Sequence, residues 1–271
     1  FLKQKPAYEI TRGLEFRRVL FRSWLTLLSN QGSLRQELGD VSGAAASLEQ
    51  WQSVGGQFVE SFPREREAHE RQTTGVAVRQ IELDIAQGRL AEALARIDPL
   101  RRGPGAVAAG AELEPTLLVD LAIQEIRVQA MRGETQLAEP AIDAALQTVL
   151  RLRELQPTNF DLVQLECRAR MSRAGLWLRI GRGAEALREY EGVIDLTATW
   201  AGKAPPEKTL KGFEADSHWL AAHISEGLGE FTKAISHLER VVEQAPQVNR
   251  NAALLRLLVV HLRLQIGRAH V

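Results

Sequence analysis

The sequence predicts an all-α protein, an α-solenoid of about five stacked helical hairpins. The chain is rich in Ala, Leu, Glu, Arg and Gln, which lose little side-chain entropy in a helix, and only 6% of its residues are aromatic. No stretch alternates apolar and polar residues for long enough to predict a half-buried strand. A pattern of one glycine followed by one alanine recurs five times along the chain, which is typical of repeat architectures.

The composition is that of a folded protein that does not span a membrane. Of 271 residues, 45% are hydrophobic and 25% are charged, which excludes a disordered chain and allows one or two domains. Cys167 is the single cysteine, so an intrachain disulfide and a multi-cysteine zinc site are excluded. We therefore expect a reducing, cytoplasmic location. No apolar run approaches the ~20 residues that a membrane span requires.

Both ends of the sequence are predicted to be foreign to the protein. Ile266–Val271 matches the translation of a common short-read sequencing adapter, and Leu14–Ser23 matches the same library sequence taken from the opposite strand. Upstream, Lys3–Ile10 resembles the outer part of the adapter, except that Pro6 stands where the usual reading has threonine. We therefore expect residues 1–23 and 266–271 to be adapter-derived and residues 24–265 to be the native helical repeat domain, truncated at both ends.

Excluding these ends changes the net charge. The whole chain has 34 basic and 34 acidic residues, but the predicted foreign segments hold seven of the basic and two of the acidic ones, which leaves a net charge of −5. A mildly acidic domain lacks the basic footprint by which proteins bind the phosphate backbone. We expect no nucleic-acid partner.

The same physical explanation applies to all five copies of the repeat. Successive glycines are separated by 49, 45, 48 and 48 residues, and each follows a helical stretch, where a positive φ ends a helix at low cost. The alanine lies in the next helix, and the side chains four and seven residues later, most of them large and apolar, share its face. The pairs are Gly39 and Ala44, Gly88 and Ala93, Gly133 and Ala138, Gly181 and Ala186, and Gly229 and Ala234.

The pattern predicts where the helices lie. First helices are expected near 24–38, 70–87, 116–132, 162–180 and 213–228. Second helices are expected near 41–54, 90–100, 135–155, 183–198 and 231–244, with a sixth pair starting at 249–265. Joints between repeats are expected at Gly55-Gly56, 101–110, 156–159 and 202–212. Pro140 either kinks its helix or lies in the first turn.

The segment from Gly229 to Pro246, with Ala234, Leu238 and Val241 at matching places, resembles the second half of a tetratricopeptide repeat (TPR). The resemblance covers roughly residues 24–265 and is to a long-period bacterial type, because the family repeat is usually ~34 residues. It implies a non-catalytic scaffold without a cofactor, whose first helices line a concave groove that binds a peptide or a partner domain.

Counting back from each repeat alanine places six residues on or near that groove. Arg and Trp are enriched at binding hot spots, so they are expected to contribute most. An alternative for Trp219 is that it packs between repeats. The six predicted groove residues are Glu82, Arg127, Arg168, Trp219, His223 and Glu226.

No catalytic residue or metal ligand is predicted. The Gly-x-Gly that begins at Gly181 superficially resembles a dinucleotide-binding turn, which needs a preceding strand, whereas a helix is expected here. His218, His223 and His237 lie close in sequence but lack a carboxylate at ligand spacing, so surface or groove histidines are expected. Cys167 is expected to be a small buried side chain.

Other functions are also compatible with the sequence. The chain could be a sensor or regulatory arm of a larger bacterial signalling protein, such as a kinase, cyclase or transcription regulator, whose catalytic module is absent from this sequence. An enzyme with an unfamiliar helical active site would show buried titratable groups clustered in one cleft. A helical-repeat RNA binder is disfavoured by the net charge. The partner and the oligomeric state are left open.

Overall fold

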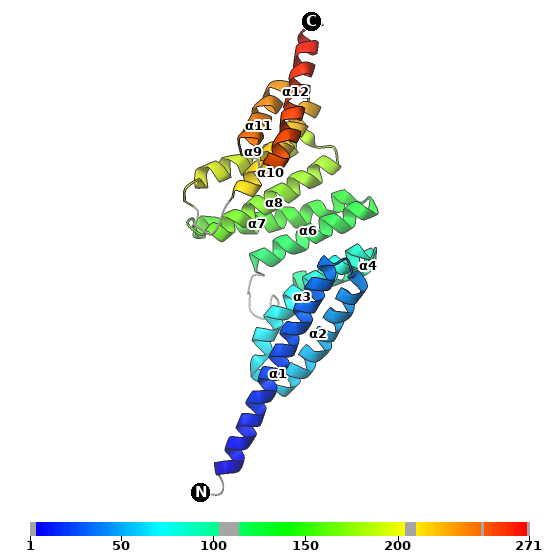
Figure 1. The fold of residues 1–271 in the computed structure, drawn as a ribbon, viewed down its shortest axis with the longest axis vertical. Helices are drawn as coiled ribbons and strands as arrows, with labels where there is room; N and C mark the ends of the chain where they lie inside the picture. Colours follow the sequence, from blue (N-terminus) through cyan, green and yellow to red (C-terminus); the bar gives the residue numbers. More distant parts are fainter. Residues whose placement is uncertain (1–3, 103–113, 204–209, 245–246, 270–271) are drawn as a thin grey trace. The chain divides into compact units, whose positions relative to one another are not determined.

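The computed structural model describes residues 4–102, 114–203, 210–244 and 247–269, and it divides into two compact units, residues 1–111 and 112–271. Every regular element among the described residues is a helix, which confirms the predicted fold class (Figure 1). The N-terminal unit, blue to cyan in Figure 1, contains α1 (Gln4–Glu37), α2 (Val41–Ser61), the 3₁₀ turn η1 (Pro63–Glu65), α3 (Arg66–Ala86) and α4 (Leu90–Arg102).

The C-terminal unit is a stack of helical hairpins. Its helices pack in the pairs α6 with α7, α8 with α9 and α10 with α11, and the first helices α6, α8 and α10 also contact their neighbours in turn. The elements are α6 (Pro115–Arg132), η2 (Thr135–Ala138), α7 (Glu139–Leu155), α8 (Phe160–Arg179), α9 (Gly183–Trp200), α10 (Lys211–Gly227), α11 (Phe231–Gln244) and α12 (Gln247–Ala269).

The turn inside each hairpin has the geometry that its glycine predicts. All five repeat glycines have φ between +73° and +80°. In the fourth repeat, the N–H of Arg182 donates to the carbonyl of Trp177 (2.8 Å), which closes the first helix in a Schellman motif. The carbonyl of Arg182 then accepts from the N–H of Ala186 (3.1 Å) and opens the second helix. One residue therefore ends one helix and starts the next.

The third repeat starts its second helix differently. The carbonyl of Glu134 accepts from the N–H of Leu137 (2.9 Å), so the segment begins as η2 before α7. Pro140 lies in the first turn of α7, where a residue without an N–H loses no helical hydrogen bond. Pro140 is therefore a first-turn proline and not a kink.

The repeat alanines lie at the contacts between helices, as predicted. All five are at most 1% exposed, and the large side chains four residues later are at most 3% exposed. Ala186 packs in one cluster with Ala174, Tyr190 and Ala221, so α8, α9 and α10 meet around its methyl group. The register deduced from the sequence is confirmed.

The expected joint at Gly55-Gly56 is wrong, because both glycines lie inside α2. A Cβ at Gly55 would lie 2.3 Å from Cε1 of His69, so this glycine permits close packing of α3 and does not make a turn. The joint at 156–159 is confirmed, and there the Asn159 side chain accepts from the N–H of Asp161 (3.1 Å) and caps α8. The joints at 101–110 and 202–212 lie largely outside the described residues.

The first helix begins at Gln4 and not near residue 24 as expected. Phe21 packs against the core of the N-terminal unit, and Arg18 and Arg22 both bond to Glu65 of η1, so residues 18–22 are attached to the fold. The side chains of residues 1–13 and 266–271 lie outside the described part. Their adapter origin stays a prediction, since the helical spacing of Phe16 and Leu20 favours a helix whatever its source.

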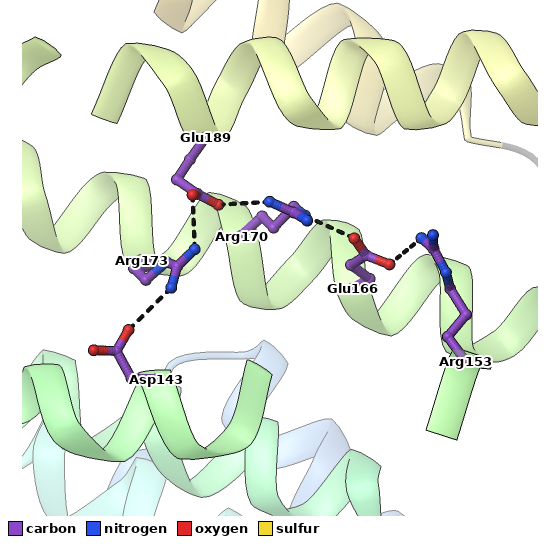
Figure 2. Close-up of polar contacts among 6 residues, drawn as sticks. All are labelled: Asp143, Arg153, Glu166, Arg170, Arg173 and Glu189. Atoms are coloured by element: carbon purple, nitrogen blue, oxygen red, sulfur yellow. Dashed lines mark hydrogen bonds and ion pairs between the residues drawn. The ribbon is translucent and has the colours of Figure 1, made fainter. Parts of the chain in front are cut away.

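A chain of ion pairs fastens α8 to the second helices on either side of it (Figure 2). Arg170 of α8 donates to Glu166 (2.7 Å) and to Glu189 of α9 (3.1 Å). Arg173 donates to Glu189 (2.7 Å) and to Asp143 of α7 (3.1 Å), and Arg153 of α7 completes the row by donating to Glu166. Glu166 is 2% exposed and Glu189 is 8% exposed, so each buried carboxylate has two arginine partners.

Trp177 extends this contact between the third and fourth repeats. The guanidinium groups of Arg173 and Arg182 lie 4.8 and 4.7 Å from the centre of its ring, and its Nε1 donates to Glu139 of α7 (2.8 Å). The hydrogen bond from Trp177 and the charge of Arg182 lower the pKa of Glu139. The α7–α8–α9 layer is thus held by polar contacts on the side of α8 that faces the second helices.

Two histidines join α10 to α11. The Nδ1 atoms of His218 and His237 are 3.0 Å apart, so one must donate and the other accept, and the two Nδ1 atoms cannot both be protonated in this geometry. Burial lowers the pKa of His218 to about 4, and the neighbouring His237 acts in the same direction. Burial also lowers the pKa of His237, although Glu191 opposes this.

Replacing Ala186 with leucine is expected to destabilise the fold by about 1–3 kcal/mol, because three helices crowd the methyl group. Chemical denaturation would measure the change. The matched control is Ala184→Leu, two residues earlier on the exposed side of α9, which is expected to be near neutral. Equal effects of the two substitutions would contradict the assigned register.

The stability of the C-terminal unit is expected to fall as the pH is lowered from 7 to 4.5. Unfolded histidine binds a proton near pH 6.5. Folded His218 does so only near pH 4, so within this window protons favour the unfolded chain. Each histidine of the pair contributes a slope of at most about 1.4 kcal/mol per pH unit.

Denaturation at a series of pH values would measure this slope. His218→Asn is expected to flatten it relative to the parent chain, whereas His261→Asn, on α12 and outside the pair, is expected to leave it unchanged. A slope that is the same in all three proteins would show that the pair does not govern the acid sensitivity.

Candidate partner-binding face

The three first helices of the C-terminal unit present one exposed side. On α8, Arg168 and Arg179 lie about half a helical turn away from the ion-paired Arg170 and Trp177, so they point away from α7 and α9. Equivalent positions on α6 and α10 are also exposed or half-buried. This first-helix face comprises Thr116, Asp120, Arg127 and Met131 on α6, Gln164, Arg168, Ser172 and Arg179 on α8, and Asp216, His223 and Gly227 on α10.

Arg168 is paired across this face. Its Nη2 donates to Oδ1 of Asp120 on α6, and both side chains remain partly exposed, at 39% and 29%. The two residues are 48 positions apart, which is the spacing of the third and fourth glycines, so they occupy the same place in successive repeats. Asp216 occupies that place in the next repeat. Sequence reasoning missed Asp120, which the repeat period alone would have found.

Arg127 is exposed on α6, two helical turns beyond Asp120. Its Nη1 donates to Oε1 of Gln124 (2.9 Å), whose side chain is buried. A neutral amide orients the guanidinium group and leaves its positive charge uncompensated by that contact. Arg127 is thus placed as the sequence predicted, on the surface of a first helix.

Trp219 and His223 form a pair on α10, with ring centres 4.6 Å apart. The Nδ1–H of His223 donates to the carbonyl of Trp219 (2.9 Å), since a carbonyl can only accept, and Nε2 is therefore the acceptor nitrogen. The indole of Trp219 also packs against the core cluster that joins α10, α11 and α12. Packing between repeats, the alternative considered for Trp219, therefore accounts for much of its surface.

Glu226 was expected on the surface of the groove, but it is buried. It is 7% exposed, and Arg256 (2.5 Å) and Arg263 of α12 both donate to its carboxylate. Its position in the repeat faces the following helix, so it holds α12 against α10. Glu82 lies half-buried on α3 in the other compact unit. Of the six predicted residues, the first-helix face accordingly includes Arg127, Arg168 and His223, while Trp219 packs beside His223.

Cys167 and Gly181, the candidates for a nucleophile and for a dinucleotide-binding turn, have structural roles. Cys167 is fully buried beside Phe160 and Val193, and burial raises the pKa of its thiol to about 12, which makes it a poor nucleophile. Gly181 follows the helix α8, so a dinucleotide-binding turn is excluded there. Within the described ranges, no three His, Cys, Asp or Glu side chains gather as metal ligands. None of the described helices could cross a membrane.

Comparisons with known proteins bear on the fold alone. No family model matches the chain, and no curated protein matches it. The crystal structure of BtubC (BKLC) from P. vanneervenii aligns with a TM-score of 0.52 at 12% identity, covering 89% of this chain and 83% of that one. This likeness supports the all-helical architecture.

Two further solved structures are similar at lower scores. TTC0263, a thermophilic TPR protein in Thermus thermophilus, gives 0.48 at 11% identity over 88% of this chain and 99% of that one. A tetratricopeptide repeat protein from Parabacteroides merdae gives 0.45 at 16% identity over 92% and 79%. With left-handed glycines and buried alanines in all five hairpins, the chain has a tetratricopeptide-like helical repeat fold.

Proposed function

We propose that this chain is a non-catalytic protein-interaction module that binds a peptide or partner domain across the first-helix face of its C-terminal unit. The main support is the row of alternating charges at one repeat position, formed by Asp120, Arg168 and Asp216 on three neighbouring helices. Such a row offers acceptors and donors at regular intervals across the helices. Arg127 and His223 add a donor and an acceptor along the same face.

The size of the face suits a short extended segment. Neighbouring packed helices lie about 8–10 Å apart, so three first helices span roughly 20 Å. An extended chain rises about 3.3 Å per residue, so about six residues would cross the face. We propose that an acidic side chain of that segment contacts Arg127, where a charged hydrogen bond contributes more than a neutral one.

The contacts on the opposite side of α8 favour partner binding without a rearrangement of the helices. Arg170, Arg173 and Trp177 hold α8 to α7 and α9 from the opposite side, and the backbone of α8 is therefore ordered before a partner arrives. Preorganisation reduces the entropy lost on association. The alternative role, a regulatory arm of a larger signalling protein, would direct the same face toward a domain of its own parent chain.

The double substitution of Arg127→Glu with Arg168→Glu is expected to weaken partner binding at least about tenfold, because a lost charged contact is replaced by repulsion. The partner would first be isolated by affinity purification with the parent chain, identified, and then titrated against purified variants. Circular dichroism would establish that each variant is folded.

Two further variants make the experiment specific. Arg151→Glu with Arg188→Glu makes the same change of charge on exposed positions of the second helices α7 and α9, and it is expected to bind normally. Asp120→Arg with Arg168→Asp keeps an internal ion pair but exchanges the charges at two of the three positions of the row, and it is expected to bind weakly. If the variants on the first helices and those on the second helices bind the partner equally well, the first-helix face is not the binding surface.

A further inference from the structure

The N-terminal unit contains a cleft of about 260 Å³ between α1 and α3, with Trp51 of α2 among its lining residues. The cleft belongs to the N-terminal unit, whereas the first-helix face belongs to the C-terminal unit. The proposed protein-binding function does not use the cleft. The volume is that of about eight or nine water molecules at ~30 Å³ each, which is room for a small organic molecule.

The cleft exists because one repeat position lacks a side chain. Gly75 precedes the glycine of its own repeat, Gly88, by 13 residues, and at that position the later repeats carry the charged row of Asp120, Arg168 and Asp216. A Cβ at Gly75 would meet no atom within 4 Å. The space that a charged side chain occupies elsewhere is therefore open in this repeat, and Gly75 lines it.

The inner wall of the cleft is apolar and fixed in place. Leu25, Trp51 and Val76 line it and are each at most 5% exposed. His69 stacks on the indole of Trp51, with ring centres 4.9 Å apart and planes 16° from parallel. The indole is thus held in one orientation and presents a rigid aromatic surface to the cleft.

The rest of the lining is polar and carries a positive charge. Nη1 of Arg79 donates to Oγ of Ser29 (3.3 Å) and to Oγ of Ser33 (2.7 Å), and these neutral hydroxyls orient the guanidinium group without cancelling its charge. The side chains of Asn30 and Gln72 add amide groups. None of the described lining residues is acidic. An anion is therefore favoured over a cation or a neutral molecule.

We propose that this cleft binds a small organic carboxylate with a compact apolar or aromatic body, of about nine non-hydrogen atoms. The carboxylate accepts from the guanidinium group of Arg79, whose planar fork matches carboxylate geometry. The apolar body packs against Trp51 and Val76, which exclude water from the ion pair. An apolar wall combined with a few converging polar groups is typical of small-molecule sites.

The test is a titration of the full chain with benzoate, followed by the indole N–H signal of Trp51 in nitrogen-15 NMR spectra and assigned with Trp51→Phe. Benzoate is expected to shift this signal saturably, with a Kd of about 1 mM or below. Benzamide, which has the same shape without the charge, is expected to bind at least about tenfold more weakly. The absence of a saturable shift with benzoate would overturn the proposal.

Three variants test whether benzoate binds in the cleft itself or elsewhere on the surface of the N-terminal unit. Arg79→Gln is expected to weaken benzoate binding at least about tenfold. Gly75→Leu is expected to fill the cleft and abolish binding while leaving the fold as stable or more stable, because leucine favours a helix over glycine. Arg64→Gln, which removes an exposed arginine of η1 in the same unit, is expected to bind benzoate normally.

A peptide end carries the same chemical group, so a tripeptide with a free C-terminal carboxylate is titrated in parallel. Binding of benzoate by the parent chain, with loss in Arg79→Gln or Gly75→Leu, supports a small-acid site. If the tripeptide binds and benzoate does not, or if both variants bind benzoate as the parent chain does, the proposal is wrong. These outcomes do not depend on whether the first-helix face of the C-terminal unit binds a protein.

Discussion

The arrangement of the helices depends on the close approach of two helices at each repeat alanine, immediately after a left-handed glycine. Any side chain longer than the methyl group of Ala186 or Ala234 would push the paired helix outward. Because one residue both ends the first helix and starts the second, the hairpin angle is determined within a few residues. All five repeats share the left-handed glycine and the buried alanine. Residues at the same repeat position therefore lie on the same side of each first helix.

Polar contacts then hold one layer in place. Between α7, α8 and α9, the carboxylates of Glu166 and Glu189 are buried, which would be costly if either lacked a partner. Each is bonded to two arginines, so desolvation is offset by paired charge and by hydrogen bonds. The network lies on the side of α8 that faces the second helices, and the opposite side is left to Arg168 and its partner Asp120.

A single repeat position explains why the two units present different surfaces. In the C-terminal unit it carries Asp120, Arg168 and Asp216, and the resulting surface is a row of alternating charges. In the N-terminal unit the position is occupied by Thr26 and Gly75, and both line a cleft with Trp51 and Arg79 on its walls. Under the two proposals above, the residue at this one position separates a polypeptide-binding surface from a small-acid site.

The sequence by itself determined the features that act within one hairpin. A glycine that ends a helix and an alanine at a close contact each depend on a few neighbouring residues, and both were predicted correctly, while the first-turn place of Pro140 was one of two local alternatives. Only the tertiary structure decided which distant side chains meet. Gly55 accommodates His69, Glu226 is buried by arginines of α12, His218 pairs with His237, and Asp120 pairs with Arg168. The physical reason is that such contacts depend on the rotation and separation of helices from different parts of the chain, and a local pattern of residue types contains neither quantity.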